Sequence, residues 1–151
     1  MGAGAGIALL ADTIVVGVGA KIGFPFLRLG LVPDYGLAYT LPQRVGIGRA
    51  RRMIFESRTV PGAEAVTLGL ADVVVADADV QAEAVRVAEN LARQPAHALA
   101  LTKQMLRSGY ADLNAALDAE LMAQTLSFLS ADHREGVAAF KEKRPPSFAP
   151  R

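Results

Sequence analysis

The alternation of short β-branched runs with long helical stretches limits most strongly what this chain can fold into. Val, Ile and Thr gather in short runs at 13–16 and 73–75, and residues 20–24 form another short extended run; such runs predict strands. The intervening segments predict helices, and from Val80 onward the pattern predicts helices alone. We therefore expect an α/β chain. Three short strands make a poor independent sheet, so the sheet needs more chain than these runs supply.

Helical signals place the remaining elements. Helices are expected near 7–11, 35–45 and 48–57, with Pro42 breaking the second, and Pro61 and Gly69 bound a further short one. The C-terminal helices are expected near 80–93, 95–108, 113–129 and 131–143, the last capped by Ser130 or Asp132. Leu113, Leu117, Leu121 and Phe128 recur at helical spacing, which predicts a buried stripe.

The organisation follows from these elements. We expect a mixed core over residues 1–78, a helical region over 79–144 and a tail over 145–151. Met1 runs directly into Gly2-Ala3-Gly4-Ala5-Gly6. A glycine-rich turn normally follows a strand that positions it, so we expect the chain to be the C-terminal part of something longer.

Composition excludes several function classes. Sixteen Lys and Arg against 15 Asp and Glu leave a net charge of +1, which gives no electrostatic footprint for nucleic acid or a membrane surface. Without cysteine there is no thiolate nucleophile and no cysteine-based metal site. His97 and His133 are expected at the surface, and no carboxylates are spaced as metal ligands on one helix face. A cytoplasmic protein without a metal is expected.

Asp34 is the candidate catalytic residue. It lies in Gly30-Leu31-Val32-Pro33-Asp34-Tyr35-Gly36, a glycine-bounded and otherwise apolar segment. Its apolar neighbours predict a poorly solvated carboxyl group, and desolvation raises the pKa of an Asp toward the range useful for proton transfer. The alternative is that Asp34 caps a helix beginning near Tyr35.

The glycine-rich segment at the N-terminus is the second candidate feature. A glycine turn that enters a helix exposes backbone N–H groups, which bind negative charge. It could form a phosphate cradle, half of an oxyanion hole, or a tight structural turn. Gly2, Gly4 and Gly6 lack the dinucleotide-binding spacing and a preceding strand, so a nucleotide site is not favoured.

Several segments, taken together and in order, resemble the crotonase or enoyl-CoA hydratase/isomerase superfamily. They are Gly2 to Asp12, Gly30 to Gly36 with Leu41 to Gly46, Glu64 to Asp72, and Asp132 to Arg144. The resemblance implies the C-terminal portion of a ββα spiral, followed by a helical region of the kind through which family members form trimers or dimers of trimers.

The resemblance also implies chemistry. Family members polarise a thioester carbonyl with two backbone amides, one of which corresponds to Ala3 or its neighbour in the glycine-rich segment. The two glutamates of the hydratase members correspond to Gly6 and Phe26, which cannot titrate, whereas Asp34 coincides with the carboxylate of isomerase members. Substrate contacts are expected at Gly2, Gly4, Gly6, Phe26, Tyr35 and Lys143. The substrate would arrive as a CoA thioester, with no other cofactor.

Three hypotheses follow. The leading one is an enoyl-CoA isomerase in which Asp34 moves a proton. In the second, Asp34 attacks the substrate covalently, as in dehalogenase members of the superfamily. In the third, the chain is a non-catalytic truncated relative that acts through homo-oligomerisation or association with a full-length relative. A hydratase in name with altered chemistry is a variant of the first.

Overall fold

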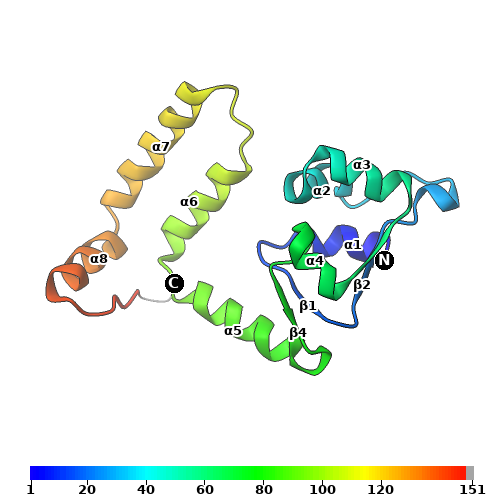
Figure 1. Ribbon diagram of the computed structural model, residues 1–151. Coiled ribbons are helices and arrows are strands. Elements are labelled where there is room, and N and C mark those ends of the chain that lie inside the picture. Colours follow the sequence, from blue (N-terminus) through cyan, green and yellow to red (C-terminus); the bar gives the residue numbers. More distant parts are fainter. Residues whose placement is uncertain (149–151) are drawn as a thin grey trace. The chain divides into compact units, whose positions relative to one another are not determined.

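Short strands pair across large distances in the sequence. The computed structural model describes residues 1–148. Strand β1 (Val15–Gly17) pairs in parallel with β4 (Val73–Val75), placing Val15 opposite Val73. Strand β2 (Lys21–Gly23) pairs antiparallel with β3 (Thr59–Pro61), placing Ile22 opposite Val60. Figure 1 shows β4 running beside β1. The expected strands at 13–16, 20–24 and 73–75 are present, and β3 is an additional one.

The glycine-rich N-terminus is helical rather than a turn ahead of a helix. Helix α1 covers Ala3–Ala8, and Gly2 is its N-cap, with φ 55°. The expected start near Ile7 was therefore wrong. Glycine has a low intrinsic helix propensity, but Ala5 and Leu9 are 4% and 5% exposed in the core. Tertiary packing of this face outweighs the propensity.

Helix α2 (Leu37–Val45) runs through Pro42, which was expected to break it. A proline inside a helix loses one backbone hydrogen bond. Leu41 and Val45, before and after Pro42, are both buried, and this packing holds the two parts of the helix in line. Gly46, with φ 79°, ends α2 and caps the next helix, α3 (Ile47–Phe55).

The first compact unit, Met1–Val87, also contains helix α4 (Gly62–Leu68). Pro61 is its N-cap and Gly69, with φ 81°, is its C-cap, as the sequence predicted. The side chains buried most completely in this unit are those of Phe24, Leu37, Leu41, Met53, Val60 and Leu70. Each such side chain contributes about 1.5–3 kcal/mol, so they fix α2 and α3 against β2 and β3. A 3₁₀ turn at Leu27–Leu29 and another at Asp77–Asp79 complete the unit's elements.

The second unit begins at Ala88, inside α5 (Val80–Ala92). It continues with α6 (Ala96–Arg107), α7 (Leu113–Phe128) and α8 (Ala131–Glu142). Asp112 caps α7 by accepting a hydrogen bond from the Ala115 amide at 2.9 Å. Of the two expected caps for α8, Ser130 is the one used, because its Oγ accepts from the His133 amide at 3.0 Å.

The stripe on α7 differs from its prediction. Leu113, Leu117, Leu121 and Phe128 are 72%, 50%, 68% and 55% exposed. The four residues share one face of α7, but the other helices of the second unit leave at least half of each side chain exposed, so the predicted burial was wrong. Of the expected tail at 145–151, residues 149–151 lie outside the described residues. Within residues 1–148 no helix has the length and apolar character needed to cross a membrane.

Candidate active site

Asp34 lies in a turn that leads into α2. The turn is bounded by Gly30 and Gly36, with φ 67° and 73°. Tyr35 has φ 49°, in the left-handed region that a non-glycine residue enters only at a cost in free energy. The carbonyl oxygen of Asp34 accepts a hydrogen bond from the Leu37 amide at 3.0 Å, so the Asp34 peptide is tied to the first residue of the helix.

The surroundings of Asp34 are more open than its sequence neighbours suggested. Asp34 is exposed, and Leu31, Val32 and Tyr35 are 56%, 78% and 56% exposed. The expected enclosure by these residues was wrong, because apolar neighbours along an extended turn do not fold back over the carboxylate. Any desolvation of Asp34 therefore has to come from a surface other than this turn.

The helix-capping alternative for Asp34 was also wrong. The N-cap of α2 is Gly36, which makes no side-chain cap hydrogen bond. Over residues 1–148, no hydrogen bond or ion pair involves the Asp34 carboxylate. A carboxylate that supports no element of the fold in this chain remains available for chemistry.

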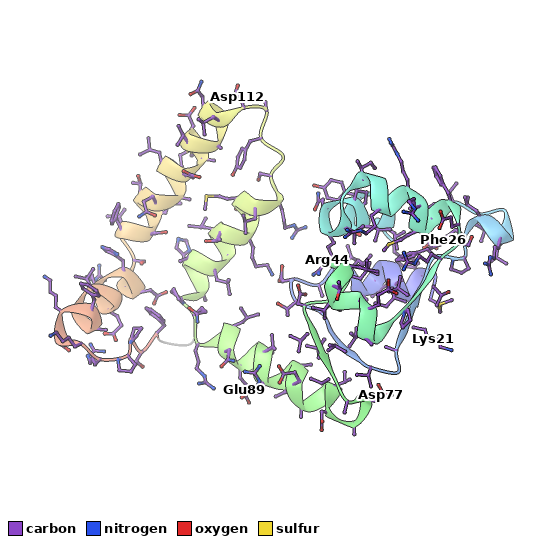
Figure 2. The ribbon with its side chains drawn as sticks, viewed as in Figure 1. Lys21, Phe26, Arg44, Asp77, Glu89 and Asp112 are labelled. Carbon is purple, nitrogen blue, oxygen red and sulfur yellow. The ribbon has the colours of Figure 1, made fainter. Side chains whose placement is uncertain are left out.

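Other carboxylates at the ends of strands have structural partners. Asp72 accepts from the Ile14 amide at 2.7 Å, and Asp77 accepts from the Gly19 amide at 2.9 Å. Asp72 also accepts hydrogen bonds from Arg44. Figure 2 labels Arg44 and Asp77. These contacts agree with the structural role expected of aspartates at element ends.

Gly6 backs directly onto the Asp34 turn. A Cβ atom built on Gly6 would lie 3.0 Å from the Cβ of Tyr35 and 3.1 Å from the carbonyl oxygen of Asp34. The absence of a side chain at this position therefore lets α1 and the turn meet. The structure brings together Gly6, Asp34 and Tyr35, three of the residues singled out from the sequence.

Backbone amides at the start of α1 are mostly occupied. Gly2 N–H donates to the Gly23 carbonyl at 2.9 Å, Gly4 N–H to Met1, and Ala5 and Gly6 N–H both to Gly2. Over residues 1–148, no hydrogen bond uses the Ala3 N–H, the first amide of the helix. This amide is free to bind an oxygen of a ligand. A Cβ built on Gly4, the next residue, would meet nothing within 4 Å.

The remaining candidate residues lie in different settings. Phe26, labelled in Figure 2, is 4% exposed and belongs to the core of the first unit. Its carbonyl accepts from the Leu29 and Leu31 amides, so it shapes the chain ahead of Asp34. Lys143 lies in the second unit, where it is exposed and ends α8 with φ 54°.

Each unit of the chain contains a hollow lined by apolar residues. One, of about 230 Å³, lies beside α1 and is bordered by Gly4, Ala8 and Leu9 together with residues of β1 and β2. The other, of about 710 Å³, lies between α6, α7 and α8 and is lined by Leu101, Met105, Leu117 and Leu121 among others. The sequence predicted neither, because a hollow arises where several elements meet.

The chain is similar to enzymes that act on acyl-CoA thioesters. A family model described as "Enoyl-CoA hydratase/isomerase" matches residues 1–151. A probable enoyl-CoA hydratase of Rhodobacter capsulatus is 40% identical over 151 residues, covering 99% of this chain and 59% of that protein. The 1,2-epoxyphenylacetyl-CoA isomerase of Escherichia coli is 38% identical over 148 residues, covering 97% of this chain and 56% of that protein.

Solved structures show the same similarity in three dimensions. The crystal structure of a putative enoyl-CoA hydratase/isomerase from Mycobacterium abscessus matches with a TM-score of 0.94 at 37% identity, covering 99% of this chain and 58% of that one. The chain thus spans less than two thirds of the length of the relatives it matches.

Proposed function

The chain belongs to the enoyl-CoA hydratase/isomerase family, with the fold of the C-terminal portion of a crotonase spiral, and on that premise we propose that it isomerises enoyl-CoA thioesters through Asp34. One observation carries the proposal: the Asp34 carboxylate, in a turn held between α1 and α2, has no partner within residues 1–148. The family resemblance puts the isomerase carboxylate at this position, and the fold gives the Asp34 carboxylate no other contact.

The proposed reaction moves one proton and one double bond. The Ala3 amide, with a second amide that the family resemblance implies, binds the thioester oxygen and stabilises the enolate. Asp34 removes a proton from C2 of a 3-enoyl thioester, and the electron pair enters the enolate. Asp34 then delivers the proton to C4 as the double bond forms between C2 and C3. The carboxylate is regenerated and no atom is gained or lost.

Hydration is the competing reaction within the family. It uses two glutamates, and the positions that the resemblance assigns to them hold Gly6 and Phe26. Neither residue has a titratable group, and Phe26 lies in the core. Two glutamates that act on water therefore have no counterpart here, whereas a single carboxylate suffices for a proton shuttle. The names of the relatives include both reactions, a 1,2-epoxyphenylacetyl-CoA isomerase and a probable enoyl-CoA hydratase, so the choice rests on the residues of this chain.

The setting of the reaction is part of the same proposal. The partner is an acyl-CoA substrate, and the protein works in the cytoplasm. It works as a homo-oligomer, a trimer or hexamer, or in association with a full-length relative. The exposed apolar face of α7 supports self-association. Gly2, Gly4, Tyr35 and Lys143 remain proposed substrate contacts.

The test is the conversion of 3-enoyl-CoA to 2-enoyl-CoA by the wild-type chain and by Asp34→Asn. We expect the substitution to lower kcat by about 10²–10⁴-fold, the usual contribution of a positioned acid/base group. Asp79→Asn is the matched control, because Asp79 is an exposed carboxylate of the same unit, in the turn before α5. It should keep the wild-type rate. Equal rates for wild type and Asp34→Asn would remove Asp34 from the chemistry.

The alternatives give different results in the same samples. Covalent attack would leave a mass increase on Asp34 that a denatured digest retains. A non-catalytic chain would show neither turnover nor binding of an acyl-CoA by calorimetry. Hydration of crotonyl-CoA at a rate above that of the isomerisation would place the chain among the hydratases despite Gly6 and Phe26.

A further inference from the structure

We propose that Gly6 is a positioning residue for Asp34: the bare Cα of Gly6 supports the Asp34–Tyr35 peptide and so sets the location of the carboxylate. This inference rests on the proposed function of Asp34. Gly6 can act on the turn only through van der Waals contact, because glycine offers neither a charge nor a side-chain hydrogen bond.

The contact between Gly6 and the turn is so close that one added methyl group would clash. A Cβ on residue 6 would lie 3.0 Å from the Tyr35 Cβ and 3.1 Å from the Asp34 carbonyl oxygen. Carbon atoms at optimal separation lie about 3.5–4.0 Å apart, so an alanine there would have to move its neighbours by a few tenths of an ångström. Two of its nearest neighbours belong to the turn that carries the carboxylate.

The geometry points to the turn as the part that would move. On one side α1 is held by Ala5 and Leu9, which are 4% and 5% exposed. On the other side α2 is held by Leu37 and Leu41, which are both fully buried. Between these anchored helices the Asp34 and Tyr35 residues are exposed. Displacement therefore falls on the Asp34–Tyr35 peptide.

The turn has little freedom to absorb such a shift elsewhere. Tyr35 already has a left-handed φ of 49°, and Gly36 follows at 73°. The Asp34 carbonyl is fixed to the Leu37 amide at 3.0 Å. Because the Asp34 side chain moves with its own peptide, a shift of the backbone becomes a shift of the carboxylate relative to the Ala3 amide on the same helix as Gly6.

The kinetic effect follows from the sensitivity of proton transfer to geometry. A misplacement of about 1 Å can cost a factor of about 100 in rate, so a few tenths of an ångström predict a several-fold loss. We expect Gly6→Ala to lower kcat for 3-enoyl-CoA about three- to tenfold. The KM should change less than kcat, because the group that the substitution displaces in this proposal is the proton carrier, Asp34.

Gly48→Ala is the matched control. Gly48 is also a helical glycine, in α3, and a Cβ there would meet nothing within 4 Å. Both substitutions replace glycine by a better helix former, so both change helix propensity, but only Gly6→Ala presses on the turn. A structural readout accompanies the kinetics: in Gly6→Ala, the amide chemical shifts of residues 34–37 should change more than any others outside α1.

A reciprocal variant tests the same contact from the other side. Tyr35→Gly removes the Cβ that lies nearest to Gly6, and glycine accepts the left-handed φ of this position. It should fold and should shift the Gly6 amide resonance, which Gly48→Ala should leave in place. This measurement keeps the test decisive if Gly6→Ala does not fold.

The outcomes separate the two proposals. Shifts at 34–37 together with a selective fall in kcat support a positioning role for Gly6. Shifts no larger than those of Gly48→Ala, or an unchanged kcat in an active enzyme, overturn it, as does a Gly6 resonance unaffected by Tyr35→Gly. If the wild-type chain turns over no enoyl-CoA, the proposed function fails, and the amide shifts alone decide whether Gly6 places Asp34.

Discussion

One guanidinium group, that of Arg44, joins the end of α2 to the segment between α1 and β1. Its Nη2 donates to the carbonyls of Ala11 and Asp12 at 3.2 and 3.3 Å, and both its Nη atoms donate to the Asp72 carboxylate at 3.3 to 3.4 Å. Asp72 also accepts from the Ile14 amide at 2.7 Å. With 17% of the Arg44 side chain exposed, this network anchors the helix that begins three residues after Asp34.

Arg44→Lys should therefore destabilise the fold, because an ammonium group cannot reproduce a fork that serves a carboxylate and two carbonyls at once. We expect a loss of about 1–3 kcal/mol in the free energy of unfolding, measured by urea titration. Arg51→Lys, on the exposed face of α3, is the control and should change stability by less than about 0.5 kcal/mol. Equal effects of the two substitutions would contradict the anchoring role.

Single residues show where inference from sequence reaches its limit. The segment from Gly30 to Gly36 and its Asp34 could be identified from residue types and order alone. The contact of Gly6 with Tyr35 and the pairing of Arg44 with Asp72 could not, because each joins residues that are far apart in the sequence and fixed by packing. The carboxyl group of Asp34 was expected to be poorly solvated for a related reason: its apolar neighbours in the sequence were taken to surround it in space.

At the scale of elements, local signals worked where a helix end depends on backbone conformation. Gly69 adopts φ 81° and ends α4, as its place after the helix predicted. Local signals failed for the start of α1 and for Pro42 in α2. There the burial of Leu9 and Leu41 decides how far each helix extends. Propensities of glycine and proline amount to about 1–3 kcal/mol, which is within reach of two or three buried side chains.

The end of α8 is held by an ionic clamp that the capping pattern did not predict. Glu135 accepts from Arg144 Nη1 and Nη2 at 2.6 and 3.0 Å and from the Ser147 amide at 2.8 Å. The Arg144 hydrogen bonds, followed by that of Ser147, lower the pKa of Glu135 to about 2. Glu135 thus holds the segment after α8.

This lowered pKa predicts how stability depends on pH. A carboxylate with a depressed pKa in the folded state stabilises it fully above the ordinary pKa of 4.5, and the contribution disappears as the pH falls toward about 2. The difference in Tm between wild type and Glu135→Gln should therefore be positive at pH 6 and shrink between pH 4.5 and 2. Glu89→Gln, an exposed position on α5, should show no such trend. A difference that does not depend on pH would contradict the clamp.

At the scale of the whole molecule, the apolar face of α7 is a feature that the packing of the second unit does not explain. Leu113, Leu117, Leu121 and Phe128 are between 50% and 72% exposed. Helical periodicity correctly predicted that these residues share a face, but it carries no information about which surface covers that face. An apolar face of this extent favours association with another surface, in agreement with the proposed homo-oligomer.

Sedimentation of the wild-type chain should consequently show self-association. Replacing both Leu117 and Leu121 with Lys should weaken it by about 10²-fold or more, since each buried leucine contributes about 1.5–3 kcal/mol and 1.4 kcal/mol is a factor of ten. Leu106→Lys is the control, because Leu106 is 83% exposed on α6, away from this face in sequence. It should sediment as wild type does. If the double variant associates as strongly as wild type while keeping its helix content, the subunits meet through another surface.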